Sequence, residues 1–405
     1  IKIHMNNSWI KNTALFLGSQ TISQFGSTLV QFAIMWYITL ETKSGVMMTI
    51  SIICGFLPTF FLSPFSGVWA DRYNRKLIIV PSDSFIAFST LVLAILFLLG
   101  YDFIWLLFVV SAIRSLGSGM QTPAIGAILP QFVPQDKLTK VNGINSSIHS
   151  VVMLISPMFS AFLLSVASIE AIFFIDVFTA LIAVFTLLFF LKIPPHKKAM
   201  ERNATTYLGD LKAGLKYIKT HKYIKHFFLF CLFFFFLIAP VSFLTPLQVT
   251  RNYGGDVWRL TAIEVAFSVG MMLGGVIVSY FKVFKNKIHT MAFACFITAI
   301  TTFALGFNIL FWIYLAIILT MGIAVPLFHT NSNVLIQEKV EQEYMGRVFG
   351  ILTMITSSMV PLGMLVFGPL ADIVSIEIIL LGTGAVLILL SILLSKNKEL
   401  LSHGK

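Results

Sequence analysis

The sequence predicts an all-α membrane protein with twelve transmembrane helices in two bundles of six. Three observations support this: an apolar composition, a series of apolar runs long enough to span a bilayer, and Lys and Arg residues concentrated in alternate connecting loops. Of the 405 residues, 57% are hydrophobic and only 11% are charged, whereas a soluble domain has roughly 25% charged residues. So few charges could not cover the surface of a water-soluble fold, and the composition excludes one.

Apolar runs recur along the whole chain, and each has about the 20 residues that a helix needs to cross the hydrocarbon core. The expected spans are 12–40, 45–70, 77–99, 103–128, 142–167, 171–191, 226–248, 261–281, 289–309, 311–334, 347–373 and 376–395. Six precede and six follow a hydrophilic stretch. We therefore expect an N-terminal six-helix bundle over 1–192, a cytoplasmic linker over 193–225 and a C-terminal six-helix bundle over 226–405.

The distribution of basic residues orients these spans, because cytoplasmic loops collect Lys and Arg. With twelve spans, 24 of the 28 Lys and Arg residues fall on the side that holds both termini. The exceptions are Lys43, Arg114, Arg251 and Arg259. We expect both termini in the cytoplasm. The net charge of +11 does not indicate a nucleic-acid partner, since the basic residues stand in short clusters between apolar runs.

Within the central hydrophilic stretch, Leu211, Leu215 and Ile218 recur at helical spacing with lysines between them. This pattern predicts an amphipathic helix at the membrane interface. A plain basic tether between the two halves explains the same residues.

The two halves also show an internal repeat with one offset. Gly67 lies 207 residues before Gly274, and Val133 lies 207 residues before Val340. Six spans separate the members of each pair, so both halves have the same orientation. Such a parallel repeat predicts a cavity between two bundles that opens to alternate sides.

The segment from Gly67 to Lys76 reads G-V-W-A-D-R-Y-N-R-K and joins spans 2 and 3. It resembles the signature G-x-L-A-D-R-x-G-R-K of the major facilitator superfamily, with Trp69 in place of Leu and Asn74 in place of the second Gly. The resemblance implies the major facilitator fold.

In that family the motif is a conformational latch, here Gly67, Asp71, Arg72 and Arg75. Gly67 allows neighbouring helices to approach closely. Asp71 can accept hydrogen bonds at a helix N-terminus, and the two arginines can join it in a network that breaks when the cytoplasmic side opens. A basic loop that only sets the topology is the alternative.

Further segments indicate which branch of the superfamily the chain resembles. They are Gly18-Ser19-Gln20 in span 1, Arg114-Ser115-Leu116-Gly117 in span 4, Tyr344-Met345-Gly346-Arg347 after span 10, and Gly368-Pro369-Leu370-Ala371-Asp372 at the end of span 11. Together they resemble the macrolide-efflux proteins, drug:proton antiporters of Gram-positive bacteria. The resemblance implies a monomeric efflux transporter in the bacterial plasma membrane, which exports amphipathic, macrolide-type drugs in exchange for protons by alternating access and confers antibiotic resistance. No cofactor is expected, because the proton gradient supplies the energy.

The sequence departs from the family at two places. The span 5 motif normally carries Gly-Pro, where this chain has Ser156 and Pro157. In the second-half copy of the latch, Val278 stands where Asp71 would repeat, and Asp372 can supply an acid on that side instead.

Four ionisable residues stand out inside the predicted spans, where an unpaired charge costs several kcal/mol. Arg114 in span 4 resembles an Arg that the family links to proton transfer; an ion pair with an acid on another first-half helix is the alternative. For Asp83 in span 3, a structural hydrogen bond is favoured over a proton site. Asp176 and Glu264 lie near the outer ends of spans 6 and 8.

Asp176 and Glu264 are the candidates for proton coupling or for attracting a cationic drug. Glu264 also matches an acid in the resembling family. For Asp176, an interfacial acid that reaches water is favoured slightly over a functional role. His149 and His329 are interpreted as structural, and no metal site is expected.

The substrate cavity is expected to include Gln24 and Gln31, on one stripe of span 1, and Trp36. Amphipathic drugs suit such a pocket of aromatic and flexible side chains. Two other functions stay open: export of a siderophore or other metabolite, and a membrane-embedded transferase. The latter needs a cluster of acids and histidines at one membrane surface, and the sequence shows none. We therefore expect a transporter without catalytic residues.

Overall fold

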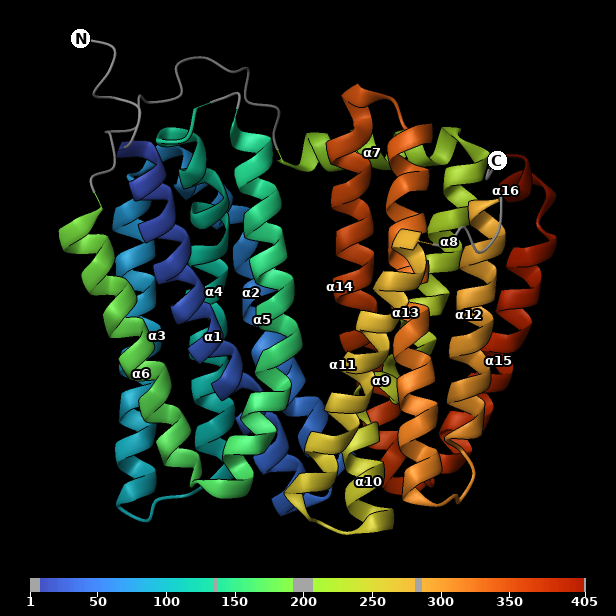
Figure 1. Ribbon diagram of the computed structural model, residues 1–405, viewed down its shortest axis with the longest axis horizontal. Coiled ribbons are helices and arrows are strands. Elements are labelled where there is room, and N and C mark those ends of the chain that lie inside the picture. The colour runs from blue at the N-terminus through green and yellow to red at the C-terminus, as the bar shows by residue number, and fades with distance from the viewer. Residues whose placement is uncertain (1–7, 135–136, 192–206, 281–285, 404–405) are drawn as a thin grey trace. The chain divides into compact units, whose positions relative to one another are not determined.

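A computed structural model describes residues 8–134, 137–191, 207–280 and 286–403, and over these ranges the chain is helical with no strand (Figure 1). The helices form two compact units. Unit 1 comprises Ile1–Glu41 and Ile50–Ala204, and unit 2 comprises Thr42–Thr49 and Thr205–Lys405.

Unit 1 contains the helices coloured blue to green in Figure 1. They are α1 (Ser8–Thr42), α2 (Gly45–Arg72), α3 (Arg75–Leu98), α4 (Ile104–Ile128), η1 (Leu129–Gln131), α5 (Leu138–Val166), α6 (Ile169–Phe185) and the π-helical turn η3 (Thr186–Phe190). The helix α3 packs along both α4 and α6, and all three contribute polar side chains to the interior of the unit.

Unit 2 contains the remaining helices. They are α7 (Tyr207–Thr220), α8 (Lys222–Leu237), α9 (Ala239–Phe243), α10 (Thr245–Tyr253), α11 (Val257–Tyr280), α12 (Lys287–Ala304), α13 (Phe311–Lys339), α14 (Gln342–Ile373), α15 (Ile376–Lys396) and α16 (Lys398–His403). The main packing pairs are α11 with α13, α12 with α13 and α15, and α8 with α14.

The predicted all-α fold with twelve spans is confirmed. Within the described residues, ten helices are long and apolar enough to cross a membrane. The other two spans are α1, which is long but rich in polar residues, and the segment from α8 to α10. In the latter, α8 has only 16 residues, and the chain then continues through two short helices that each have Pro in the first turn.

The central hydrophilic stretch contains the helix α7, and its place at the membrane interface stays a prediction. The helix α7 packs on α14 in unit 2, where Tyr217 stacks on Tyr344 with ring centroids 4.5 Å apart. Leu215, Lys216 and Lys219 are exposed. The bundle boundaries at 192 and 226 stay a prediction, because residues 192–206 lie outside the described residues.

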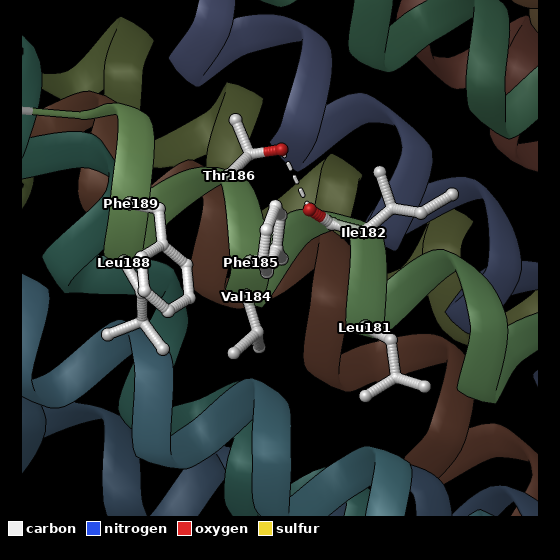
Figure 2. Close-up of a pocket in the computed structure, with 7 residues that line it drawn as sticks. All are labelled: Leu181, Ile182, Val184, Phe185, Thr186, Leu188 and Phe189. Carbon is white, nitrogen blue, oxygen red and sulfur yellow. Dashed lines mark hydrogen bonds between the residues drawn. The ribbon is translucent and has the colours of Figure 1, made fainter.

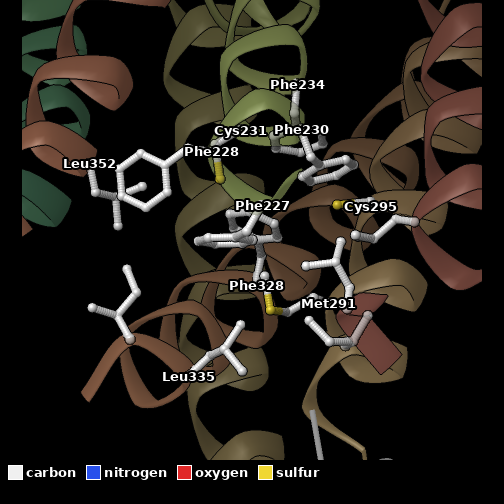
Figure 3. Close-up of a cluster of buried hydrophobic side chains, with 14 of the residues drawn as sticks. Phe227, Phe228, Phe230, Cys231, Phe234, Met291, Cys295, Phe328, Leu335 and Leu352 are labelled. Carbon is white, nitrogen blue, oxygen red and sulfur yellow. The ribbon is translucent and has the colours of Figure 1, made fainter. Parts of the chain in front are cut away.

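The core of unit 2 is rich in phenylalanine. Phe230, Phe234 and Phe235 of α8 pack their rings against Phe328 of α13, and Phe228 lies beside Leu352 of α14 in the same core cluster (Figure 3). The rings of Phe234 and Phe328 stack with centroids 5.1 Å apart. These aromatic side chains hold α8 against α13, as burial of large apolar surface does in general.

Glycines allow a close helix contact in unit 2, between α11 and α13. A Cβ atom on Gly270 would lie 2.1 Å from the carbonyl oxygen of Leu319, and one on Gly274 would lie 2.3 Å from that of Ile323. Small residues allow membrane helices to pack backbone against backbone. The repeat position Gly274 is therefore a packing residue, and the rigid pair fixes the direction in which α11 presents Glu264.

Candidate functional site

Unit 1 encloses an ion pair between α4 and α6. The guanidinium group of Arg114 pairs with Oδ2 of Asp176. Thr90 of α3 also donates to Oδ2, at 3.1 Å, and Ser27 of α1 donates to Oδ1 at 3.0 Å. The second guanidinium nitrogen, Nη2, donates to the carbonyl oxygen of Ser27 at 3.1 Å. Four helices thus meet at one carboxylate.

This geometry shows which contacts the two residues make, while their roles in proton coupling stay predictions. Arg114 does pair with an acid on another first-half helix. The interpretation of Asp176 as an interfacial acid that reaches water is wrong, because Asp176 is 0% exposed and Arg114 only 8%. The position of Asp176 near the end of its predicted span did not show that its side chain points into the interior of unit 1.

The groups around the pair of Arg114 and Asp176 form one polar layer of unit 1. A second polar layer surrounds Asp83. Oδ1 of Asp83 on α3 accepts hydrogen bonds from Ser23 of α1, at 3.1 Å, and from Gln121 of α4, at 2.8 Å. Gln121 also donates to the side-chain oxygen of Gln20, at 3.3 Å. Oδ2 of Asp83 and the amide nitrogen of Gln20 are buried and have no hydrogen-bond partner. The structural hydrogen bond expected for Asp83 is therefore present on one oxygen only.

The two layers follow the same helix faces. Ser23 and Ser27 are four residues apart on α1, and Asp83 and Thr90 are seven apart on α3; both spacings return to one face of a helix. Unit 1 therefore holds a polar column bounded by α1, α3, α4 and α6. Sequence reasoning identified both acids in this column but not the residues that join them.

The environment of Glu264 on α11 is the opposite of that of the paired acid Asp176. It is partly exposed, and within the described part of unit 2 its carboxylate has no hydrogen bond or ion pair. Arg259, on the same helix, pairs with Asp256 at 2.9 Å and packs its guanidinium group 5.3 Å from the Trp258 ring. A carboxylate without a partner on a membrane helix is available to bind a proton or a cation.

Asp372 at the C-terminal end of α14 binds the start of α2. Its carboxylate accepts hydrogen bonds from the Ser44 hydroxyl at 2.7 Å and from the backbone N–H groups of Gly45 at 2.7 Å and Val46 at 2.9 Å. Arg251 of α10 pairs with the same carboxylate at 2.7 Å. The acid thus acts as a cap for the positive end of a helix. The expectation that Asp372 replaces the acid missing from the second-half copy of the latch is wrong, because α14 ends at the opposite end of unit 2 from the turn between α11 and α12.

The contact extends along the first turn of α2, within unit 2. A Cβ atom on Gly45 would lie 2.1 Å from the carbonyl oxygen of Gly368, and the Thr49 hydroxyl donates to the carbonyl oxygen of Met364 at 3.0 Å. This close packing explains why Thr42–Thr49 belong to unit 2 while the rest of α2 belongs to unit 1.

The predicted latch is described in part. Gly67, Asp71 and Arg72 lie on the last turns of α2, and their side chains are outside the described residues, so their role stays a prediction. Arg75 is buried in unit 1, 7% exposed, and donates to the carbonyl oxygen of Ala127 on α4.

Asn74, which departs from the family signature, has a local role. It is the N-cap of α3, and its side-chain oxygen accepts a hydrogen bond from the backbone N–H of Lys76 at 3.0 Å. Asn is among the best N-cap residues. The residue that weakens the match to the signature therefore stabilises the start of the next helix.

The residues predicted to line the cavity differ in exposure. Gln31 is exposed and Gln24 is partly buried. Trp36 is 0% exposed and packs its ring 5.8 Å from that of Phe32. Trp36 is therefore a packing residue, whereas the two glutamines are accessible polar groups of α1.

Two surface grooves are apolar. One, of about 410 Å³, is lined by the end of α6 and by η3, including Phe185, Leu188 and Phe189 (Figure 2). Thr186 also lines this groove, and its hydroxyl group donates to the carbonyl oxygen of Ile182 at 2.7 Å. The other, of about 280 Å³, lies between α1 and α5. Neither is lined by an ionisable side chain, so the acids described above lie elsewhere. Among the described residues, no group of three His, Cys, Asp or Glu side chains could hold a metal ion.

The chain matches the model of the Major Facilitator Superfamily over residues 16–364. It is 28% identical over 396 residues to macrolide efflux protein A of Streptococcus pyogenes, covering 97% of this chain and 98% of that protein. It is 30% identical over 323 residues to macrolide efflux protein A of Enterococcus faecalis, covering 79% and 99%. A solved structure of a bacterial homologue of the iron transporter ferroportin, in the inward-facing state, has the same fold, with a TM-score of 0.71 at 15% identity over 96% of this chain and 99% of that one.

Proposed function

The chain belongs to the Major Facilitator Superfamily, and from this premise we propose that it is a secondary active transporter that exports amphipathic, macrolide-type drugs in exchange for protons. It is a multi-pass membrane protein of a transporter family. In our proposal it acts as a monomer in the bacterial plasma membrane, with both termini in the cytoplasm and the proton gradient as its energy source.

The observation that supports proton coupling is the contrast between two membrane acids. Asp176 is fully buried and paired with Arg114, so its charge is matched. Glu264 is partly exposed on α11 and has no partner among the described residues of unit 2. An unmatched carboxylate is the better proton acceptor, because binding a proton removes an uncompensated charge from a medium of low dielectric constant.

The same carboxylate suits a cationic amphipathic substrate. A protonated amine can form an ion pair with Glu264 only when the carboxylate is ionised. Proton and drug then compete for one charge, and this competition couples their opposite fluxes. Gln24 and Gln31 of α1 are the polar groups that we propose for orienting the substrate, with hydrogen bonds that do not depend on charge.

The remaining predicted residues have supporting roles in this proposal. The pair of Arg114 and Asp176 holds α4 and α6 against α1, and Gly67, Asp71, Arg72 and Arg75 form the conformational latch. The described contact of Arg75 with α4 supports an anchoring role for this residue at the start of α3.

The test is accumulation of labelled erythromycin in drug-susceptible cells that express the chain. We expect low accumulation that rises when a protonophore collapses the gradient. Glu264→Gln should abolish the difference while the protein is still found in the membrane. Asp102→Asn is the matched control, because Asp102 lies exposed in the turn before α4 and its loss should not change export.

Two outcomes would contradict parts of this proposal. Unchanged accumulation in cells that contain the protein in their membranes would remove macrolides as substrates, and siderophore export would be tested next. Full export by Glu264→Gln would remove this residue as the coupling site.

A further inference from the structure

Asp83 is a buried carboxyl group of unit 1 that the proposed mechanism does not use. It is 2% exposed. The Ser23 hydroxyl and the Gln121 amide donate to Oδ1. Oδ2 is equally buried and has no hydrogen-bond partner, and the neighbouring amide nitrogen of Gln20 has none either. Half of this carboxyl group is therefore unmatched in the interior of the bundle.

No cation offsets a charge on Asp83 among the described residues. The charged groups that α4 and α6 bring toward α3 at this level are Arg114 and Asp176, which pair with each other. The basic residues of α3 itself bind elsewhere: Arg75 donates to the carbonyl oxygen of Ala127, and Lys76 to that of Leu188 at 3.1 Å. The helix α1 contributes only the neutral groups of Ser23 and Gln20.

The two acids of the polar column thus differ in one respect. Both are almost fully buried, but the charge of Asp176 is balanced by a guanidinium group and by donors on both oxygens, whereas Asp83 would be an isolated negative charge. An isolated buried carboxylate is unfavourable, and the group takes up a proton instead. Pairs of acids with such opposed environments commonly divide structural and proton-carrying roles between them.

We propose that Asp83 is a proton-binding site: it holds a proton in the arrangement seen here and releases it when α1 and α4 move apart and water reaches the carboxyl group. In the release step the O–H bond of the acid breaks, the proton passes to water, and the electron pair stays on the carboxylate. Ser23 and Gln121 then stabilise the anion through the hydrogen bonds that they already direct at Oδ1.

The position of Asp83 fits release toward the cytoplasm. It lies eight residues from the start of α3 at Arg75, the end that the Lys and Arg distribution places on the cytoplasmic side. Release on that side is the direction that a proton-driven exporter requires. This direction rests on the proposed function, whereas the presence of the proton rests on the contacts of Asp83 alone.

The direct test is infrared spectroscopy of the purified full-length protein at neutral pH. A neutral carboxylic acid has a C=O stretch distinct from that of a carboxylate. We expect this band to lose intensity in Asp83→Asn, which mimics the protonated acid, and to keep it in Asp102→Asn, which changes an exposed acid in the turn before α4. The variant Glu264→Gln shows how much of the band comes from Glu264. Full intensity in Asp83→Asn would overturn the proposal, and so would loss of the same intensity in Asp102→Asn.

A second variant guards against a failure of Asp83→Asn to fold. Gln121→Leu removes a hydrogen bond that favours the anion, so the acid should deprotonate at a higher pH than in the unchanged protein. The same pH for both would contradict the proposal.

Proton counting in proteoliposomes separates this site from the function. Asp83→Asn should lower by one the number of protons exchanged per drug molecule. If the unchanged protein exports no drug but the band still depends on Asp83, the proposed function fails and the site stands. If it exports drug in exchange for protons and the band does not depend on Asp83, the site fails alone.

Discussion

Arg251 of α10 and Asp372 of α14 form an ion pair, 2.7 Å between Nη2 and Oδ1, around the first residues of α2. The guanidinium group also donates to the carbonyl oxygen of Lys43 at 2.6 Å. The pair therefore holds both the turn before α2 and, through Asp372, the first backbone N–H groups of the helix. One carboxylate serves as the cap of α2 and the partner of a cation.

Removal of this cap should loosen the start of α2. Asp372→Ala removes three hydrogen bonds to residues 44–46, and loss of a helix cap typically costs about 1 kcal/mol. We expect an unfolding temperature a few degrees lower in detergent. Asp256→Ala is the control, because it breaks an exposed pair with Arg259 and should have little effect. Equal temperatures for both variants would contradict a capping role.

Loss of either partner of the buried ion pair should be severe. Arg114→Leu leaves Asp176, and Asp176→Leu leaves Arg114, as an uncompensated charge in the interior of unit 1, at a cost of about 3–5 kcal/mol. We expect little monodisperse protein from either single variant. The double variant removes both charges and should recover a large part of the folded yield, measured by size-exclusion chromatography. Independent, additive losses would show that the pair is not coupled.

The backbone contact between α11 and α13 should not accept larger side chains. Gly270→Val places a side chain where a Cβ atom would lie 2.1 Å from the Leu319 oxygen, so the helices must separate. We expect a strong loss of folded protein, measured by thermal unfolding. Gly275→Ala is the control on the same helix, because a Cβ atom there meets nothing within 4 Å. Tolerance of Gly270→Val would mean that the helices do not pack this closely.

Because Asn74 caps α3, two substitutions at this position should differ in their effect on stability. Asn74→Ala loses the hydrogen bond to the Lys76 N–H and should destabilise the protein by about 1 kcal/mol, whereas Gly at an N-cap costs only a few tenths. We therefore expect Asn74→Gly, which restores the family signature, to unfold close to the temperature of the unchanged protein. An unfolding temperature for Asn74→Ala equal to that of Asn74→Gly would exclude the capping role.

The fold could be predicted from the sequence because the length and apolarity of a span are local properties. The contacts of the ionisable residues could not, because they depend on the rotation of each helix about its axis. Asp176 lies near a span end in the sequence, yet its side chain points inward to Arg114. Likewise, the sequence placed Asp83 at membrane depth, but only the packing of α1, α3 and α4 shows that one of its oxygens lacks a partner.

For some candidate positions the sequence offered a local signal whose meaning it could not settle. Glu264 was singled out as an intramembrane acid, but a lone acid does not show whether it will find a partner. The role of Asn74 had a local signal, since Asn before a helical segment is a typical N-cap; comparison with the signature drew attention to the lost Gly instead.

The polar content of α1 bears on how the protein is made. This helix falls outside the ten spans that are apolar enough on their own, and its serines and glutamines find their partners on α3, α4 and α6, all of which follow it in the chain. The first span is therefore poorly suited to enter the bilayer alone. During synthesis it should stay beside the insertion machinery until those later helices emerge and shield its polar face, so that early insertion depends on residues not yet translated.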